Sequence, residues 1–473
     1  MYIDGQWTNG HSDSHIDVEN PATEQIIAQV PSGCAKDATQ ALDAASKAQP
    51  AWAALTAIER GDWVKKLAQA VKNKSDHLAK VIVCEQGKPL AQAKGEVAAM
   101  VNFLSYSAEQ ARRVLGDVIP SDHIDEEIFI RRLPYGVVVA LTAWNYPAAL
   151  VARKLAPALV AGNTIVIKAH ECTPLSALEL AKLCEQVGIP AGVVNVVTGD
   201  GIEVGDALVR SEKSDLVTMT GSNRAGQQIY AAGAQQIKVL RLELGGKAPF
   251  IVMDDADIEQ AVEAAVTSRF TNCGQICTCN ERMYLHKDIA EQFTRAFVEK
   301  VQQLQVGDPM YDLDIGPKVN ADELNKIAQM VDLAVSEGAQ ILTGGNKLTE
   351  GIFSRGHWFE PTVLKVTSND LSIMHQEIFG PVIPLMEVES YEQALELAND
   401  TQYGLSAYVF TKDLKRIMNL KTSLQFGEIY VNRSGGEMVQ GFHNGWNSSG
   451  IGGEDGPYGF DNYLRKQTTY LSW

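Results

Sequence analysis

Residues 136–168, GVVVALTAWNYPAALVARKLAPALVAGNTIVIK, contain the pattern that decides the fold. The apolar run from Gly136 to Leu141 predicts a buried strand that ends in a turn at 144–147. Pro147 is suited to the first position of the following helix, which we expect to extend to about Val160. The residues from Thr164 to Lys168 predict a second strand. A strand, a helix and a strand in this order are the repeating unit of a parallel sheet.

The same alternation continues in both directions along the chain. Further strands are predicted over 193–197 and 216–220, and each is followed by a predicted helix. Another helix is predicted over 175–186. Apolar residues at helical spacing also occur over 37–52, 60–84 and 96–114. The second half repeats the pattern, with strands near 250–253, 283–285, 340–342 and 407–410 and helices over 257–268 and 288–303. We therefore predict an α/β fold with two doubly wound parallel-sheet lobes, divided near the glycine pair 245–246.

Composition excludes several classes of protein. The chain has 473 residues, and its 41 Lys and Arg against 58 Asp and Glu give a net charge of −17, which is unlike a nucleic-acid binder or a protein held on anionic lipid. The apolar stretch 137–162 is interrupted by polar and proline residues, so no membrane span is predicted. The N-terminus has no basic and apolar leader, which favours a cytoplasmic location.

Three of the seven cysteines, Cys273, Cys277 and Cys279, lie within seven positions. A metal site is disfavoured because the nearest histidine, His286, has no partner, and we predict no metal. Buried inert cysteines are the common alternative. The polar Gly-Gln flank favours a nucleophilic thiolate instead, provided that an acid–base partner lies elsewhere.

Two other residues could serve such a nucleophile. Glu243 has apolar neighbours on both sides, so it could be a buried carboxyl with a raised pKa, or else a solvated group on a surface strand. Asn145 could donate to an oxyanion, or could simply cap the helix that follows. The glycines of 221–226 match neither a P-loop nor the G-x-G-x-x-G motif, yet they could expose backbone amides to a diphosphate.

Six short blocks occur in a fixed order: WNYP, IVIK, TGS-x3-G, LELGGK, N-x-GQ-x-C and EIFGP. Together they resemble the aldehyde dehydrogenase superfamily across the whole chain. The resemblance implies that Cys277 is the nucleophile, that Glu243 is the general base, and that Asn145 stabilises the oxyanion together with the backbone N–H of Cys277. It also implies that Lys168 contacts the cofactor ribose and influences the catalytic groups. The chain departs from the family pattern at Ala143 and Ala169, where prolines are usual.

The resemblance further implies a nicotinamide cofactor. Glu377 and Phe379 match the pair that holds the nicotinamide ribose and ring. Glu171 matches a carboxylate on the adenosine ribose, which repels a 2′-phosphate, so we predict NAD over NADP. The remaining cofactor-binding residues that the resemblance nominates are Ala143, Trp144, Gly201, Gly221, Ser222 and Leu244.

The reaction implied is oxidation of an aldehyde through a cysteine thiohemiacetal and a thioester, which Glu243 helps water to hydrolyse; coenzyme A–acylating members typically lack that base. The C-terminal segments 426–433, 440–446 and 449–453 look most like lactaldehyde dehydrogenases, which also act on glycolaldehyde. Matching positions nominate Arg153, Thr278, Glu437 and His443 as substrate residues. For Arg153 and His443 the alternatives are a helix-surface ion pair and an ordinary loop histidine.

Other functions stay open from sequence. Arg153 would suit succinate semialdehyde, and Tyr146, Trp446 and Glu437 would suit betaine aldehyde. Two hypotheses come from other functional classes: a cofactor-independent thiol esterase and a non-catalytic binding protein. Cys279 could also form a reversible disulfide with Cys277, or could be inert.

The resemblance also predicts how the chain divides. Residues 1–122 and 141–244, with part of 430–459, would form the NAD-binding domain, and 245–429 the catalytic domain. Residues 123–140 and 460–473 would form a bridging β element that pairs across subunits, so that the protein is a homodimer or homotetramer. The only other partner expected is the small aldehyde substrate.

Overall fold

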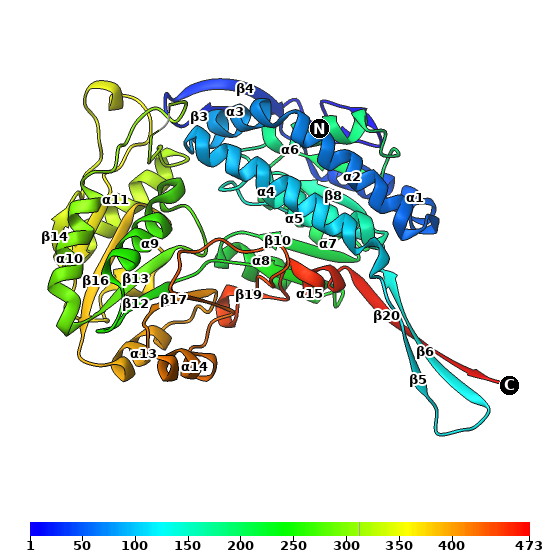
Figure 1. Ribbon diagram of the computed structural model, residues 1–473. Coiled ribbons are helices and arrows are strands. Elements are labelled where there is room, and N and C mark those ends of the chain that lie inside the picture. The colour runs from blue at the N-terminus through cyan, green and yellow to red at the C-terminus, as the bar shows by residue number, and fades with distance from the viewer. Residues whose placement is uncertain (312) are drawn as a thin grey trace.

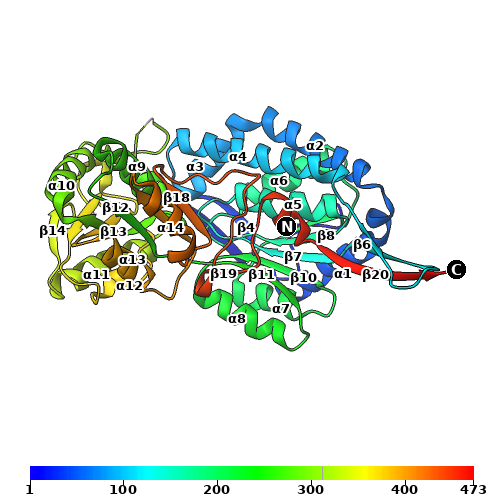
Figure 2. The ribbon, with the colours of Figure 1, turned by 60° about the horizontal axis from the view of Figure 1, so that its bottom comes forward.

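Two β-sheets organise the chain, each in its own lobe, and a long arm of antiparallel strands projects from the first lobe (Figures 1 and 2). The computed structural model describes residues 1–311 and 313–473. Most neighbouring strands in the two large sheets are parallel, and the antiparallel pairs lie at their edges. The predicted α/β class with two parallel-sheet lobes and a small β element is confirmed.

The first sheet has eight strands in the order β19-β11-β10-β7-β8-β9-β1-β2. Its strands are β1 (Tyr2–Ile3), β2 (Gln6–Trp7), β7 (Val137–Leu141), β8 (Thr164–Lys168), β9 (Val194–Val197), β10 (Leu216–Thr220), β11 (Val239–Glu243) and β19 (Gly450–Ile451). The central strands are short, β-branched and buried on both faces, as strands covered by helices must be. β19 comes from near the C-terminus and pairs with β11, the strand that ends at Glu243.

Helices cover both faces of this sheet (Figure 2). Val138 and Ala140 of β7 face one core, whereas Val137 and Val139 face the other, because successive side chains of a strand point to opposite faces. The first core is covered by α2 (Ala57–Asn73), α3 (Ser75–Gln86), α4 (Leu90–Glu109), α5 (Ala149–Ala161) and α6 (Leu175–Gln186). The second is covered by α1 (Ala35–Ala54), α7 (Asp206–Arg210) and α8 (Asn223–Ala234).

The second sheet has seven strands in the order β14-β15-β16-β13-β12-β17-β18. They are β12 (Ala248–Val252), β13 (Asn280–His286), β14 (Gln340–Thr343), β15 (Thr362–Lys365), β16 (Val382–Val388), β17 (Ser406–Phe410) and β18 (Glu428–Val431). Its helices are α9 (Ile258–Phe270), α10 (Lys287–Val301), α11 (Ala321–Ser336), α12 (Ser372–His375), α13 (Tyr391–Asn399) and α14 (Leu414–Ser423). The glycines 245 and 246 join β11 to β12 and so connect the two lobes.

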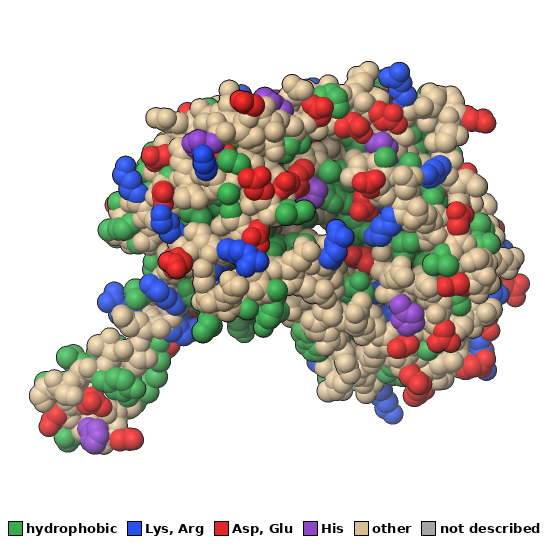
Figure 3. All heavy atoms as spheres, turned by 180° about the vertical axis from the view of Figure 1, so that it is seen from behind, with side chains coloured by type: hydrophobic (Ala, Val, Ile, Leu, Met, Phe, Trp, Pro, Cys, Tyr) green, Lys and Arg blue, Asp and Glu red, His purple; other side chains and the backbone are tan. Residues whose placement is uncertain are grey.

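The arm consists of β5 (Asp117–Pro120), β6 (Glu126–Pro134) and β20 (Leu464–Ser472), and α15 (Gly456–Asp461) precedes its last strand. A separate hairpin, β3 (His15–Asn20) with β4 (Gln25–Pro31), lies near the N-terminus. The predicted bridging range 123–140 thus covers β6 and all of β7 except Leu141, while β5 lies ahead of it. Figure 3 shows hydrophobic side chains on the arm, and Val118, Tyr470 and Trp473 are each about two-thirds exposed.

Two local expectations were wrong. The range 60–84 is two helices, which meet at Lys74, and α5 begins at Ala149 rather than at Pro147. Among the described residues, no helix combines the length and apolarity needed to cross a membrane.

Candidate active site

A cavity of about 280 Å³ lies where the two lobes meet, and most of the predicted site residues line it. The lining comes from α4 and the β7–α5 turn of the first lobe and from the segment before β13 in the second lobe. The predicted residues in its wall are Ala143, Trp144, Asn145, Arg153, Gly221, Ser222, Leu244, Cys277, Thr278, Glu377, Phe379 and Glu437. Glu243 and His443 are not in this wall but lie next to residues that are, namely Leu244 and Glu437, whereas Lys168, Glu171 and Gly201 lie at or just after the carboxyl ends of β8 and β9.

A left-handed turn leads to Cys277. Asn272, Cys273 and Gly274 have φ values of 52°, 56° and 69°, a region that costs non-glycine residues on the order of 1–3 kcal/mol each. Gly274 is required, because a Cβ there would lie 2.2 Å from the Gly380 oxygen. Gln86 holds the turn by donating to Asn272 Oδ1 at 3.0 Å. The turn leaves the thiol of Cys277 partly exposed in the cavity wall.

Asn145 lies opposite this turn and does not cap a helix. Its Nδ2 donates to the backbone oxygen of Gln275 at 2.9 Å, and Asn272 Nδ2 donates in return to the Asn145 oxygen at 3.1 Å. The amides of Ala148, the residue before α5, and of Ala149, its first residue, donate instead to Glu96 Oε1 at 2.9 and 3.1 Å. The Asn145 amide is therefore held against the backbone segment that leads to Cys277, and both residues line the same cavity.

Lys88 and Glu96, which sequence reasoning missed, position Asn145. Lys88 Nζ lies 2.6 Å from Glu96 Oε2 and donates to the Asn145 oxygen at 2.8 Å. Both side chains are fully buried. A lysine and a glutamate eight residues apart match no motif, so no sequence signal set this pair apart.

Glu243 is buried at the end of β11, and neither of its side-chain oxygens has a hydrogen-bond partner. Its Oε2 lies 3.5 Å from His443 Nε2. Burial raises the pKa of Glu243 to about 8, with Glu454 adding to the shift and His443 opposing it. The surface-strand alternative is therefore wrong, and the carboxyl is suited to accept a proton near neutral pH.

A polar wall surrounds His443. Its Nδ1 lies 2.9 Å from Glu428 Oε2 and 3.9 Å from Glu437 Oε1, and Glu437 accepts a hydrogen bond from Thr278 Oγ1 at 3.1 Å. Among the described residues, Glu428, Glu437 and His443 are the one group with three donors close enough to hold a metal ion. Because hydrogen bonds within the protein already engage each of them, the geometry does not require a metal.

Arg153 projects from α5 into the cavity wall while it remains ion-paired. Its Nε donates to Asp455 Oδ1 at 3.0 Å and lies 3.4 Å from Glu454 Oε2. Its side chain is only 9% exposed, which excludes an ordinary ion pair on the helix surface. The two carboxylates neutralise its charge before any substrate enters.

The other end of the cavity suits a nicotinamide ribose. Glu377 Oε1 accepts a hydrogen bond from the Gly246 amide at 2.9 Å, and a Cβ at Gly245 would lie 2.4 Å from Glu377 Oε2. Burial raises the pKa of Glu377 to about 7. Phe379 packs edge-on against Trp144, with ring centroids 5.3 Å apart. Gly245 thus leaves room for the Glu377 carboxylate, and two aromatic rings line the same cavity, which fits a ribose and a flat heterocycle.

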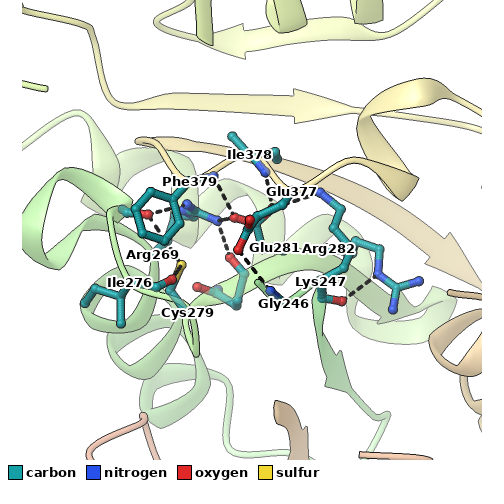
Figure 4. A network of polar contacts seen from close by, with 12 residues as sticks. Gly246, Lys247, Arg269, Ile276, Cys279, Glu281, Arg282, Glu377, Ile378 and Phe379 are labelled. Atoms are coloured by element: carbon teal, nitrogen blue, oxygen red, sulfur yellow. Dashed lines mark hydrogen bonds and ion pairs between the residues drawn. The ribbon is translucent and has the colours of Figure 1, made fainter. Parts of the chain in front are cut away.

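Glu281 organises this end of the site (Figure 4). Its carboxylate binds Lys247 and Arg269 at 2.9 Å each and accepts the amides of Ile378 at 2.7 Å and Phe379 at 3.0 Å. Burial acts to raise the pKa of Glu281, but the two cations and the amides outweigh it and lower the pKa to about 2. Adjacent Glu281 and Arg282, directly before the apolar run of residues 283–285 in β13, were a signal that could have revealed this network.

The predicted adenosine end lies at the carboxyl ends of β8 and β9 in the first sheet. Lys168 Nζ pairs with Glu171 Oε1 at 2.7 Å, and a Cβ at Gly201 would lie 3.9 Å from the same oxygen. Ser222 caps α8 by accepting the Ala225 amide at 3.3 Å, so the positive end of that helix faces the cavity wall. This arrangement fits a ribose beside Glu171 and a diphosphate near α8.

The other two clustered cysteines differ from Cys277. Cys279 is buried, and its thiol donates to the Ile276 oxygen at 2.9 Å. Burial raises the pKa of Cys279 to about 12 and that of Cys273 to about 11. Both are therefore protonated near neutral pH.

Comparisons with known proteins agree with this geometry. The model of the aldehyde dehydrogenase family matches residues 7–469. The chain is 49% identical to 3,6-anhydro-alpha-L-galactose dehydrogenase of Vibrio sp. (strain EJY3), covering 100% of this chain and 99% of the relative, and 46% identical to lactaldehyde dehydrogenase of Escherichia coli (strain K12), covering 100% and 98%.

A solved structure of 3,6-anhydro-L-galactose dehydrogenase in complex with NAP superposes with a TM-score of 0.98 at 49% identity, over 100% of this chain and 99% of that one. The family is NAD(P)-dependent. A thiol, a buried carboxyl and an amide around one cavity, together with a family match over nearly the whole length, lead to one conclusion: the chain is an oxidoreductase that belongs to the aldehyde dehydrogenase family.

Proposed function

We propose that this enzyme uses NAD to oxidise a small hydroxylated aldehyde, such as lactaldehyde or glycolaldehyde, to the carboxylic acid. The observation that carries the proposal is the polar wall of Thr278, Glu437 and His443 beside Cys277. These side chains offer both hydrogen-bond donors and acceptors, as a substrate hydroxyl requires. The names of the two relatives described above support the same class, and 3,6-anhydrogalactose is a second candidate because its dehydrogenase is 49% identical.

The alternative substrates fit less well. Succinate semialdehyde needs a free cation for its carboxylate, whereas Arg153 is already paired with Asp455 and Glu454. Betaine aldehyde needs open aromatic faces for its quaternary ammonium. Lys88 Nζ occupies one face of Tyr146, 3.5 Å from the ring centroid.

For the chemistry, we propose that Cys277 attacks the aldehyde carbon and that the Asn145 amide and the Cys277 backbone N–H stabilise the oxyanion. Bound NAD supplies the hydride acceptor. Glu243 then takes a proton from water, which hydrolyses the thioester on Cys277. The unpartnered oxygens of Glu243 are free to bind that water, which favours hydrolysis over transfer to coenzyme A.

We propose the following roles for the cofactor residues. Glu377 and Phe379 hold the nicotinamide ribose and ring, and Lys168 and Glu171 hold the adenosine ribose. Because a carboxylate at Glu171 repels a 2′-phosphate, NAD is preferred. Ala143, Trp144, Gly201, Gly221, Ser222 and Leu244 complete the binding surface.

We propose that the arm of β5, β6 and β20 bridges subunits in a homodimer or homotetramer. Its exposed apolar side chains, including Val118, Tyr470 and Trp473, support this because such patches are uncommon on monomers. Residues 1–122 and 141–244 would serve as the NAD-binding domain, with part of 430–459, and 245–429 as the catalytic domain.

The test is NADH formation with L-lactaldehyde, glycolaldehyde, 3,6-anhydrogalactose, succinate semialdehyde and betaine aldehyde. We expect the hydroxylated aldehydes to have values of kcat/KM at least about tenfold above the other two, since one lost hydrogen bond to a polar pocket is worth about 1–3 kcal/mol. The double variant Thr278→Val, Glu437→Gln should reduce this preference. Comparable rates on all five substrates would contradict the proposal.

A further inference from the structure

Phe379 has a strained backbone, and its amide and its carbonyl oxygen contact groups of opposite charge. Its φ of 55° lies in the left-handed region, which a bulky side chain rarely adopts. Its amide donates to the Glu281 carboxylate at 3.0 Å (Figure 4), and its carbonyl oxygen accepts a hydrogen bond from Lys318 Nζ. Because strained residues persist only where their surroundings fix them, these two contacts account for the conformation of Phe379.

Lys318 is a fully buried cation without a close counter-ion. In the described part of the chain, its ammonium donates only to the Phe379 oxygen, and the nearest carboxylate oxygen, Glu323 Oε2, lies 3.9 Å away. Burial lowers the pKa of Lys318 to about 8, with Glu323 opposing the shift, so most of these amines are still charged at pH 7. Since a buried charge is costly and an apolar side chain could fill the same space, the contact with Phe379 is the feature that requires a lysine here.

The ammonium of Lys318 also lies beside the two aromatic rings at the cofactor end of the cavity. Its Nζ is 5.9 Å from the ring centroid of Phe379 and 6.0 Å from that of Trp144, within the range of a cation–π interaction. Both rings line the cavity, whereas Lys318 does not. Lys318 therefore acts on the cavity through these neighbours and not by touching a bound molecule.

The backbone that carries Lys318 is fixed on both sides. The Lys318 amide donates to the His357 oxygen at 2.8 Å, and the next amide, that of Val319, donates to Gln275 Oε1 at 3.1 Å. Gln275 lies two residues before Cys277. The loop that carries the ammonium is thus attached to the segment that carries the predicted nucleophile.

We propose that Lys318 is a positioning residue for the nicotinamide ring. By binding the carbonyl of Phe379, it keeps the Phe379 ring in the place where the nicotinamide lies against it. The inference rests on the proposed role of Phe379 in holding that ring, and it involves no covalent step. Loss of Lys318 should therefore weaken binding of the nicotinamide part of the cofactor and leave binding of the adenosine diphosphate part unchanged.

The experiment compares two ligands by titration of the full-length enzyme at pH 7. NADH is followed by its own fluorescence, and ADP-ribose, which lacks only the nicotinamide ring, is followed by calorimetry. In Lys318→Met we expect the Kd of NADH to rise about tenfold and that of ADP-ribose to stay within about twofold of the wild type. ADP-ribose is the matched control, because general damage to the fold would weaken both ligands.

Phe379→Leu is measured alone and together with Lys318→Met. In the Phe379→Leu background, Lys318→Met should change the Kd of NADH by less than about twofold, because the effects of residues that act through each other are not additive. A full effect of Lys318→Met in that background would show that Lys318 does not act through Phe379, and would overturn the proposal.

A folded Lys318→Met enzyme, shown by circular dichroism and thermal melting, that binds NADH as tightly as the wild type would also overturn it, as would an equal loss of NADH and ADP-ribose. If that variant does not fold, Lys318→Gln, whose side chain is shorter and uncharged, tests the same contact, and wild-type affinity for NADH in it would be equally fatal. If Phe379→Leu alone leaves NADH binding unchanged, the proposed role of Phe379 fails. If it weakens NADH binding while Lys318→Met does not, only the role of Lys318 fails.

Discussion

Lys88 Nζ donates a hydrogen bond to the backbone oxygen of Asn145, 2.8 Å away, so a buried ammonium between α3 and α4 holds the turn that carries the predicted oxyanion donor. Glu96 compensates this charge at 2.6 Å and also caps α5. The pair therefore connects the positioning of the site to the stability of the first lobe.

Replacing Lys88 with Met should lower both stability and kcat. The variant leaves Glu96 buried without its cation, which is expected to cost about 3–5 kcal/mol in the free energy of unfolding. The Asn145 turn also loses a support, so kcat should fall about tenfold or more. Urea unfolding and steady-state kinetics measure the two effects.

The double variant Lys88→Met, Glu96→Gln is the control for this prediction. Removing the orphaned charge should restore most of the stability, while kcat should stay low. If stability and kcat both recovered in the double variant, Lys88 would affect kcat only through stability.

Glu243→Gln should separate the two half-reactions. In the proposed mechanism Glu243 acts on the water of the hydrolytic step, so one equivalent of NADH should form in a burst, and steady turnover should then fall by about 10²–10⁴. Stopped-flow absorbance measures both phases. A variant with no burst would mean that Glu243 is already needed to form the thioester.

The raised pKa of Glu243 sets a pH dependence. A base must be deprotonated, so thioester hydrolysis in the wild type should rise with pH through about 8. Its pKa lies above the ordinary value of 4.5, so its contribution to stability is fully present below about 4.5 and is lost as the pH rises through about 8. Glu243→Gln should therefore lose less stability than the wild type between pH 6 and pH 9, measured as the change in Tm.

Glu281→Gln should weaken cofactor binding and the second lobe. Loss of the carboxylate leaves Lys247 and Arg269 buried without their anion, at a cost of about 3–5 kcal/mol. The KM for NAD should rise because the amides of 378 and 379 lose their acceptor.

Since the pKa of Glu281 is lowered to about 2, its stabilisation is present above about 4.5 and is lost as the pH falls towards 2. The difference from wild type in unfolding free energy should therefore shrink at low pH, and a constant difference would argue against this charge network.

Glu171→Ser should relax the choice of cofactor. We expect the wild type to prefer NAD, and the ratio of kcat/KM for NADP to that for NAD to rise about tenfold, equivalent to about 1.4 kcal/mol. Glu171→Gln keeps the shape of the side chain and removes its charge. It should behave like Glu171→Ser if charge repulsion of the 2′-phosphate is the cause. The proposed role of Glu171 would be ruled out if the wild type preferred NADP and Glu171→Ser kept the same preference.

The sequence predicted the parts of the fold that local pattern determines. The β-branched runs at 137–141, 164–168 and 216–220 are strands as predicted, because they are apolar on both faces. The break at Lys74 was missed, since no glycine or proline marks it. The true start of α5 was missed because its cap, Glu96, comes from a helix some fifty residues earlier.

The candidate site also contains residues that local sequence motifs identified and residues that they did not. Cys277, Asn145 and Glu377 lie in short motifs, and the cavity brings them together. Lys88, Glu96, Glu281 and Glu428 act through buried contacts between distant segments, and no local pattern reports such contacts. Asn272 shares features of both groups. It lies in the N-x-GQ-x-C motif, but its left-handed backbone conformation could not be predicted from the sequence.

The arm has a consequence for how the chain reaches its native state. β6 pairs with β20 from Leu464↔Pro134 to Ser472↔Glu126, and β19 joins β11, so the first lobe is completed by strands that come much later in the chain. During synthesis the facing edges of β6 and β11 must therefore stay unpaired until β20 and β19 have left the ribosome. Such long-range pairing slows folding and exposes strand edges to aggregation. A chain shortened by its last ten residues should accumulate in aggregates, even though every residue of the catalytic cavity is present.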